Sequence, residues 1–383
     1  MPIDARLRLA LALALTAASL PALAADLVAK LAPGALEVVF RSGVDGCAPI
    51  DIPDVNPRAF HASDGTVAMF ALHYVNRALR GPDLSHLKID CDVALDSGFD
   101  LDPAHYNDRR YLAATWTDDG QRVAALAHQE YHADEHGRCS VATTLGCWFN
   151  SIIAFSSRDG GHSFAMDRPA VVASAPFPQN EQQGRHRGFF NPSNIFSDGQ
   201  YEYVFAATTG WDGQPYGACL FRASNPFDSA DWRAWDGAQF SIRYADPYVD
   251  KSRPKPCAPI APFGLPVGSV TRSNNGRWLA VWVAAGGAGA EPIAGIYSAT
   301  SGDVLHWSAP KLLLAGKVIL DPGCGGDALA YPSILDEAKG GRNFDHMGDA
   351  PWLYYTSISM NGCETGARAL TRRRLAITSG ARP

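Results

Sequence analysis

A strand–turn–strand unit recurs along this chain and constrains its fold more than any other feature. In each unit a polar turn separates two runs rich in apolar, β-branched and aromatic residues. The paired runs cover residues 57–60 and 66–72, 111–116 and 122–127, 191–196 and 201–206, 269–272 and 278–283, and 331–335 and 352–356. The turn glycines are Gly65, Gly120, Gly199, Gly276 and Gly348, at intervals of 55, 79, 77 and 72 residues.

One such hairpin cannot bury both of its faces, but five of them, each extended by two outer strands, can close radially. We therefore predict an all-β fold, a five-bladed β-propeller of four-stranded antiparallel blades. The blades are expected at residues 45–105, 106–170, 185–255, 260–317 and 325–380. We expect residues 36–41 to pair with the last strand, residues 370–377, and close the ring of N- and C-terminal strands. An open β-sandwich with similar turns is the alternative.

The N-terminus has the three-part pattern of a secretory signal peptide. Arg6 and Arg8 form a short basic region, an Ala/Leu run follows, and residues 22–24 form a small-x-small cleavage signal. We assign residues 1–25 to the signal peptide and residues 26–383 to a single propeller domain. No later stretch approaches about 18 uninterrupted apolar residues. A secreted or periplasmic protein without a membrane partner is expected.

Cysteine usage and charge agree with export. The mature part holds all eight cysteines, an even number that indicates disulfides, and no free thiol is expected. Eight cysteines allow 105 complete connectivities, and Cys139–Cys147 is the most local possible bridge. Removing Asp4, Arg6 and Arg8 with the signal changes the net charge from −6 to −7, which argues against a nucleic-acid partner. We expect a monomer without a cofactor, and a structural calcium stays open.

Two turns carry a resemblance to known propellers. Residues 157–164, Ser-Arg-Asp-Gly-Gly-His-Ser-Phe, resemble the Asp-box of sialidases, in which the Asp accepts backbone and hydroxyl hydrogen bonds. Residues 301–308, Ser-Gly-Asp-Val-Leu-His-Trp-Ser, look like a turn common in five-bladed propeller glycosidases of the arabinanase/xylosidase and fructosidase groups. The resemblance covers essentially the whole mature chain. It implies a glycoside hydrolase with acids on successive blades.

In a propeller, residues just before each first strand and just after each second strand line one funnel. Glycosyl transfer needs a pair of carboxylates there. The catalytic candidates are Asp108, Glu130 and Asp54, and the substrate-binding candidates are Arg58, His128, His132, Arg187, Asn191, Trp211, Asp327 and Tyr331. We expect Asp108 and Glu130 to face the same funnel.

Plainer readings of these residues stay open. The alternating His128, Glu130 and His132 could form a solvated rim, or with Asp134 a metal site that would need further ligands. Asp108 could only cap a turn.

The leading function is therefore hydrolysis of an exogenous oligo- or polysaccharide. One alternative is a non-catalytic, lectin-like propeller. Another is a sialidase-like exo-glycosidase that would bind an acidic sugar through Arg58, Arg185 and Arg187, since sialidases hold a carboxylate with three arginines. Sialidases have six blades, however, and a Tyr/Glu nucleophile pair.

Overall fold

In the computed structural model, the described residues are 27–211, 213–287 and 291–379. The signal peptide predicted at residues 1–25 lies outside them. The described residues form strands joined by loops, with three short 3-10 turns: η1 (Pro103–His105), η2 (Thr144–Cys147) and η3 (Ser229–Asp231). Within this described part, no helix has the length and hydropathy needed to cross a membrane. The fold is all-β, as predicted.

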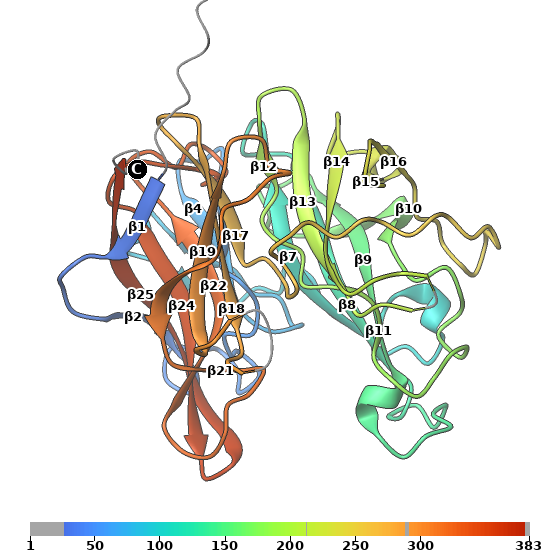
Figure 1. The fold of residues 1–383 in the computed structure, drawn as a ribbon. Coiled ribbons are helices and arrows are strands. Elements are labelled where there is room, and N and C mark those ends of the chain that lie inside the picture. Colours follow the sequence, from blue (N-terminus) through green and yellow to red (C-terminus); the bar gives the residue numbers. More distant parts are fainter. Residues whose placement is uncertain (1–26, 212, 288–290, 380–383) are drawn as a thin grey trace, which may run out of the picture.

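The strands follow one another as antiparallel meanders, which we number in chain order. The first is β3 (Arg58–His61), β4 (Val67–Phe70), β5 (Leu79–Gly81) and β6 (Lys88–Ile89); the second is β7 (Arg109–Trp116), β8 (Val123–His132), β9 (Trp148–Ser157) and β10 (Ala165–Ala173). The third is β11 (Arg187–Phe190), β12 (Phe196–Ser197), β13 (Glu202–Thr208), β14 (Gly217–Ala223), β15 (Arg233–Trp235) and β16 (Phe240–Ile242). It shares one sheet with the second meander, because β11 pairs with β9 in parallel (Figure 1).

The two remaining meanders complete the chain. The fourth is β17 (Ser269–Ser273), β18 (Trp278–Ala284), β19 (Gly295–Ser301) and β20 (Lys311–Ala315), with β23 (His346–Met347) added to its edge. The fifth is β22 (Asp327–Leu335), β24 (Trp352–Asn361) and β25 (Glu364–Ser379), with β21 (Lys317–Val318) added in parallel at its edge. Both β1 (Leu27–Leu31) and β2 (Glu37–Arg41) pair with β25, so the predicted meeting of the chain ends is confirmed.

Buried apolar clusters join each meander to the next. Representative pairs within one cluster are Phe60 and Phe155, Phe149 and Phe221, Phe205 and Trp282, Val281 and Leu353, and Met69 and Tyr354. In order, these pairs join the first meander to the second, the second to the third, the third to the fourth, the fourth to the fifth and the fifth back to the first. The core therefore consists of layers between neighbouring sheets.

Arg58 touches every meander. Its five N–H groups donate to Ala113 O at 2.6 Å, Pro57 O at 3.2 Å, Ser333 Oγ at 2.7 Å, Pro192 O at 3.0 Å and Gly268 O at 2.7 Å. The side chain is buried, and burial lowers the pKa of its guanidinium to about 9. Because an arginine has five N–H donors, none remains for a substrate. The prediction that Arg58 binds substrate is therefore wrong.

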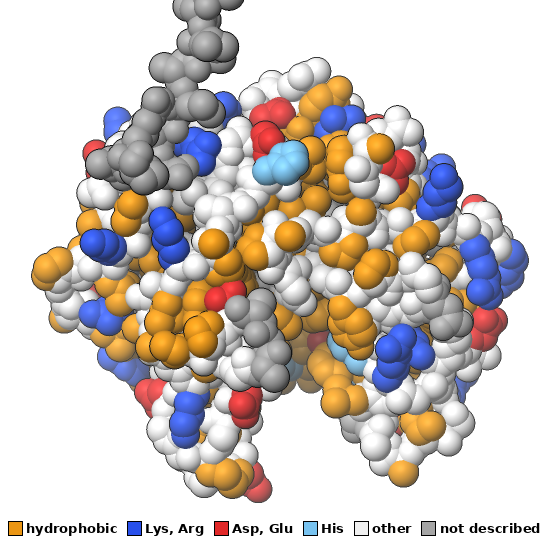
Figure 2. Space-filling model, viewed as in Figure 1, with side chains coloured by type: hydrophobic (Ala, Val, Ile, Leu, Met, Phe, Trp, Pro, Cys, Tyr) orange, Lys and Arg blue, Asp and Glu red, His pale blue; other side chains and the backbone are white. Residues whose placement is uncertain are grey.

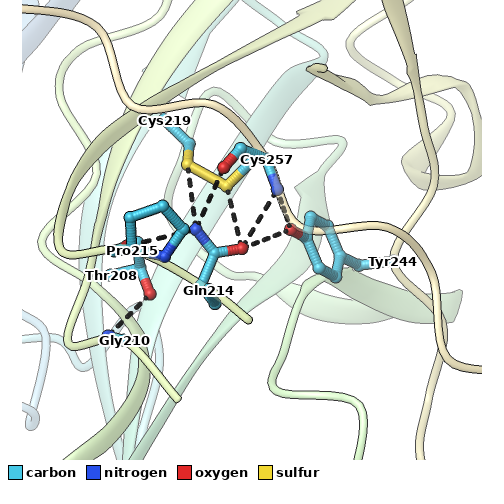
Figure 3. Close-up of a disulfide and its surroundings, with 7 residues drawn as sticks. All are labelled: Thr208, Gly210, Gln214, Pro215, Cys219, Tyr244 and Cys257. Carbon is cyan, nitrogen blue, oxygen red and sulfur yellow. Dashed lines mark hydrogen bonds between the residues drawn. A yellow bond between two sulfur atoms is a disulfide. The ribbon is translucent and has the colours of Figure 1, made fainter. Parts of the chain in front are cut away.

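All eight cysteines form disulfides: Cys47–Cys91, Cys139–Cys147, Cys219–Cys257 and Cys324–Cys363. The predicted local bridge and the absence of a free thiol are confirmed. The Cys219–Cys257 bridge is buried beside Gln214, whose Oε1 accepts the Cys257 N–H at 3.0 Å and the Tyr244 hydroxyl at 3.2 Å (Figure 3). The bridge therefore ties the strand β14 to the loop that follows the third meander.

The turn at residues 157–164, which resembles an Asp-box, stabilises the fold. Asp159 accepts the hydroxyls of Ser157 and Ser163, at 2.6 and 2.5 Å, and the backbone N–H groups of His162 and Ser163. It closes the turn between β9 and β10. Phe164 then packs edge-on against Phe70 of the first meander, with ring centroids 5.6 Å apart. The expected hydrogen bonds to Asp159 are observed.

Candidate active site

Asp54 provides the first carboxylate of the site. It lies in the loop before β3, where its N–H donates to Ala71 O at the end of β4. Its side chain is 14% exposed, lies 3.1 Å from His73 Nε2 and forms an ion pair with Arg368 of β25. Burial alone would raise the pKa of Asp54, but the His73 hydrogen bond and the Arg368 charge outweigh burial and lower it. Asp54 is therefore ionised at neutral pH.

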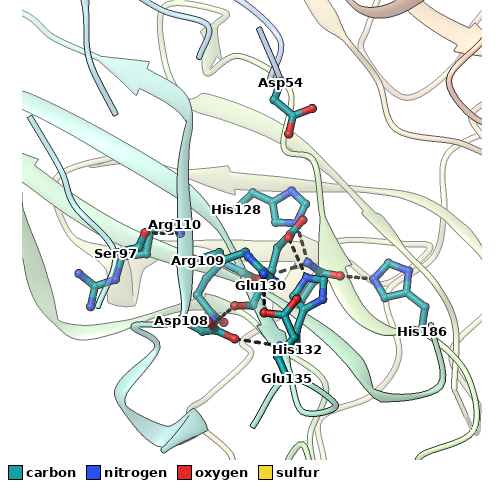
Figure 4. A network of polar contacts seen from close by, with 12 residues as sticks. Asp54, Ser97, Asp108, Arg109, Arg110, His128, Glu130, His132, Glu135 and His186 are labelled. Carbon is teal, nitrogen blue, oxygen red and sulfur yellow. Dashed lines mark hydrogen bonds and ion pairs between the residues drawn. The ribbon is translucent and has the colours of Figure 1, made fainter. Parts of the chain in front are cut away.

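Glu130 provides the second carboxylate, near the end of β8. Its Oε1 is 3.3 Å from His128 Nε2 and its Oε2 is 3.0 Å from His132 Nε2. Since side chains alternate along a strand, His128, Glu130 and His132 share one face of the second meander. Figure 4 shows Glu130 between the two histidines, with Asp54 beyond His128.

A chain of hydrogen bonds orients His128. Its Nδ1 is 2.6 Å from Asn191 Oδ1, and its Nε2 is 2.5 Å from Asn150 Nδ2, while Asn150 Oδ1 contacts His186 Nε2. The Asn191 backbone N–H also lies 3.2 Å from His128 Nδ1, so Asn191 contacts the ring through both its side chain and its backbone. Burial lowers the pKa of His128 and lowers that of His186 to about 3. Both imidazoles are therefore neutral at neutral pH.

Two tyrosines lie near both carboxylates. Tyr331 donates its hydroxyl to Asp54 Oδ1 at 3.0 Å, and the Tyr111 ring packs 5.2 Å from His73 and 5.8 Å from His128. Burial raises the pKa of each phenol well above its ordinary value, and the charges of Asp54 and Glu130 both raise it further. Asp54 and Glu130 are therefore linked by a continuous series of contacts through His73, Tyr111 and His128.

Asp108 lies apart from this centre. Its carboxylate accepts the backbone N–H of His132 at 2.9 Å and is 3.0 Å from His136 Nε2, and its side chain has no exposed surface. With no exposed atom, Asp108 does not line an open funnel, contrary to the expectation above. Its contacts match the turn-capping alternative, because they fix the loop that follows β8.

Two other predicted binding residues, Trp211 and Asp327, are also placed elsewhere, whereas Arg187 directly follows His186 and its binding role stays a prediction. Trp211 is buried in the core, edge-on to Phe189 at 5.4 Å, so it offers no face for a sugar. Asp327 is exposed at the start of β22, where its carboxylate accepts the Ser357 hydroxyl at 3.2 Å. Arg187 is buried at the start of β11, and its Nε and Nη1 have no hydrogen-bond partner. The structure brings together Asp54, Glu130, His128, His132, Asn191 and Tyr331.

Several residues of the site were missing from the predicted set. His73 and Tyr111 follow the same positional rule as Asp54 and Glu130, at a strand end and a strand start, and that rule could have found them. Asn150 lies in β9, and His186 directly precedes β11. These two strands belong to different meanders and pair in parallel. Arg368 comes from the last strand. No local sequence pattern indicates these three contacts.

The site lies at the edge of the molecule where β8 ends and β11 begins. Figure 2 shows a hollow at the lower edge of the molecule, with histidine side chains in its wall. His132, Trp148 and His186 stack in series, with centroids 5.0 and 4.6 Å apart. Within the described ranges, no three His, Cys, Asp or Glu side chains are arranged to hold a metal ion.

The sequence matches no known protein family and no curated protein. Among solved structures, the chain is similar to the catalytic domain of a GH62 α-L-arabinofuranosidase from Coprinopsis cinerea, at 10% identity over 92% of this chain and 97% of that one, with a TM-score of 0.44. It is similar to an endo-arabinase from Bacteroides thetaiotaomicron, at 11% identity, 87% and 97% coverage and a TM-score of 0.46. It is also similar to a thermostable family-43 glycoside hydrolase, at 11% identity over 90% of this chain and 98% of that one, with a TM-score of 0.47. At these identities and scores, the likeness assigns no activity to this chain.

Proposed function

We propose that this protein is a secreted or periplasmic glycoside hydrolase that acts on an exogenous oligo- or polysaccharide. Its five meanders would be the blades of a closed propeller, a view supported by the clusters that join neighbouring meanders and by the bonds of Arg58 to all of them. The observation that carries the proposal is the series of contacts from Asp54 through His73, Tyr111 and His128 to Glu130, which brings two carboxylates to one site.

The surroundings of the two acids assign their roles. Asp54 is paired with the Arg368 cation, and its pKa is lowered, so it is the ionised partner. Glu130 has no arginine partner and lies between His128 and His132, at 3.3 and 3.0 Å, so we assign it the role of proton donor. Two carboxylates in different environments are what acid–base cleavage of a glycosidic bond requires.

In the proposed reaction, Glu130 gives its proton to the glycosidic oxygen as the bond to the anomeric carbon breaks. Asp54 stabilises the positive charge that develops on the sugar ring and assists the attack of water. If Asp54 acts as the base, it takes the proton of that water, and exchange with solvent restores both carboxyl groups. If Asp54 acts as the nucleophile, Glu130 takes the proton of the water that displaces Asp54 from the sugar. The anomeric configuration of the first product, followed by NMR, distinguishes a base role of Asp54 from a nucleophile role.

The test is a glycan panel incubated with the mature protein, with reducing ends measured. On any substrate that the wild type cleaves, Glu130→Gln should lower kcat by about 10²–10⁴-fold, the usual contribution of general acid catalysis. The matched control is Glu202→Gln, at the turn end of β13, which should keep its activity. Unchanged turnover in Glu130→Gln would falsify the proposal. Glycan binding without any cleavage would favour the lectin-like alternative.

A further inference from the structure

Two aromatic side chains beside Asp54 have no task in the proposed reaction. Phe99 is 44% exposed, and the partly buried Tyr74 meets its ring edge-on at 5.3 Å. We call this pair the aromatic rim. Phe99 has a backbone φ of 49°, a left-handed conformation that is rare for a bulky residue. Strained backbone clusters at ligand-binding sites, and here it holds an exposed aromatic ring.

The aromatic rim is continuous with the carboxylate site. The Tyr74 ring lies 4.1 Å from the His73 ring and 5.7 Å from that of Tyr111. His73 Nε2 is in turn 3.1 Å from Asp54 Oδ2. Phe99 is therefore connected to Asp54 through two side chains, Tyr74 and His73.

The loop that carries Phe99 is fixed on both sides of it. Gly98 N–H donates to Asn107 Oδ1 at 2.9 Å, and Asp100 N–H donates to Asn107 O at 3.0 Å. The Ser97 hydroxyl donates to Tyr74 O at 3.1 Å. These bonds position the exposed ring before any ligand arrives, which limits the entropy lost on binding.

Arg109 adds a polar group to the aromatic rim. Its guanidinium lies 5.8 Å from the ring centroids of both Tyr74 and Phe99, and Glu135 holds it at 2.6 Å. A sugar ring has an apolar face of C–H groups and an edge of hydroxyls. An aromatic face beside an arginine matches both parts of such a ring.

We propose that the aromatic rim binds a second sugar ring of the substrate, next to the ring whose bond is cleaved. This inference rests on the proposed glycoside hydrolase function and adds that the substrate is a saccharide chain of at least two residues. The ring stacks on Phe99, and its hydroxyls accept hydrogen bonds from Arg109.

The test compares kcat/KM on a longer oligosaccharide with kcat/KM on the shortest substrate cleaved. Loss of an aromatic contact of 0.5–1.5 kcal/mol corresponds to about a 2- to 10-fold change. Phe99→Ala should therefore lower the long-to-short ratio by about 2- to 10-fold, mainly through KM, and Phe99→Tyr should restore it. The matched control is Tyr201→Ala, which removes another arginine-paired ring, 4.0 Å from Arg222, at the turn between β12 and β13. The control should keep the wild-type ratio.

Each outcome decides one of the two proposals. If the wild type cleaves substrate and Phe99→Ala keeps the same ratio, the aromatic rim is not a subsite. If the wild type cleaves nothing, the proposed hydrolase function fails, and affinity electrophoresis in gels containing each polysaccharide then tests the rim alone. Weaker retardation of Phe99→Ala than of the wild type and Tyr201→Ala supports the rim. Equal retardation, or none of the wild type, overturns it.

Discussion

The hydroxyl of Tyr331 donates a 3.0 Å hydrogen bond to Asp54 Oδ1, across 277 positions of sequence. Tyr331 has a φ of 52° and precedes Pro332, and Asn191, which contacts His128, has a φ of 45° and precedes Pro192. Both residues interrupt an inner strand and turn their side chains toward the site. A non-glycine residue in this conformation costs on the order of 1–3 kcal/mol. Two matching interruptions at the site indicate that this strain serves to orient Tyr331 and Asn191.

The first prediction concerns the acidic limb of the pH profile. The His73 hydrogen bond and the Arg368 charge hold the pKa of Asp54 below its ordinary value. Arg368→Met removes that charge, so the acidic limb of kcat/KM should move to higher pH by about 1 unit or more. Arg368→Lys keeps the charge and should move it less. If the limb stays at the same pH in both variants, Asp54 is not the ionised group of the reaction.

The same shift affects stability. Because the folded-state pKa of Asp54 lies below its unfolded value of about 3.9, the group stabilises the fold above that pH. This contribution is lost as pH falls through the folded-state pKa. Urea denaturation between pH 5 and pH 2 should show a smaller acid loss in Arg368→Met than in the wild type, provided that both start from a folded state at pH 5.

A second prediction concerns Glu202, half-buried at the start of β13. Burial, aided by the charge of Asp118, raises its pKa to about 7. The native state therefore holds a proton that the unfolded state releases near pH 4.5, so stability falls as pH rises from about 4.5 to 7. Glu202→Gln should remove this fall and be more stable at pH 8 by about 1–2 kcal/mol, after allowance for solvent screening. Equal wild-type and variant stabilities by urea denaturation at both pH 5 and pH 8 would contradict this.

Position along the hairpins predicted one part of the site well. Asp54 and Glu130 both come from the ends of strands in the predicted pairs, and the structure links them through His73, Tyr111 and His128. The same rule chose Arg58, but a position at a strand end does not tell whether a long side chain points to the solvent or to the axis between sheets. Arg58 is long enough to reach four backbone carbonyls and a hydroxyl there.

Strand bounds were less predictable in the third meander. Residues 191–196 were expected as one strand, but β11 ends at Phe190 and only Phe196–Ser197 pairs further on. Pro192 has no N–H to donate, and Asn191 has a positive φ. The Asn-Pro-Ser at residues 191–193 and the Tyr-Pro-Ser at 331–333 are a local signal for both interruptions.

A third prediction ranks the disulfides by access. Cys47–Cys91 and Cys324–Cys363 join exposed residues, whereas both cysteines of Cys219–Cys257 are buried. A reductant must reach a sulfur atom to attack it. In the folded protein, mild reductant should therefore open the two exposed bridges before Cys219–Cys257, as read by differential alkylation and peptide mapping. The ranking should vanish in denaturant. Early opening of Cys219–Cys257 in the folded protein would contradict it.

The last prediction concerns Arg58 at the centre of the meanders. Burial lowers the pKa of its guanidinium to about 9, which corresponds to a cost of about 5 kcal/mol for holding the cation. Against this cost stand five hydrogen bonds from a charged donor, each contributing about 1.5–3 kcal/mol. Removing the side chain also leaves three buried carbonyls of neighbouring meanders without this donor.

Because the hydrogen bonds contribute more than burial of the cation costs, Arg58→Met should lower the free energy of unfolding by about 2–5 kcal/mol. Arg58→Lys should recover little of this loss, because an ammonium has three donors and no planar fork. The control is Arg41→Met, whose side chain is 57% exposed and lies 3.9 Å from Asp45, and which should lose less than about 1 kcal/mol. A loss in Arg58→Met no larger than in this control, measured by urea denaturation at pH 7, would show that Arg58 does not hold the meanders together.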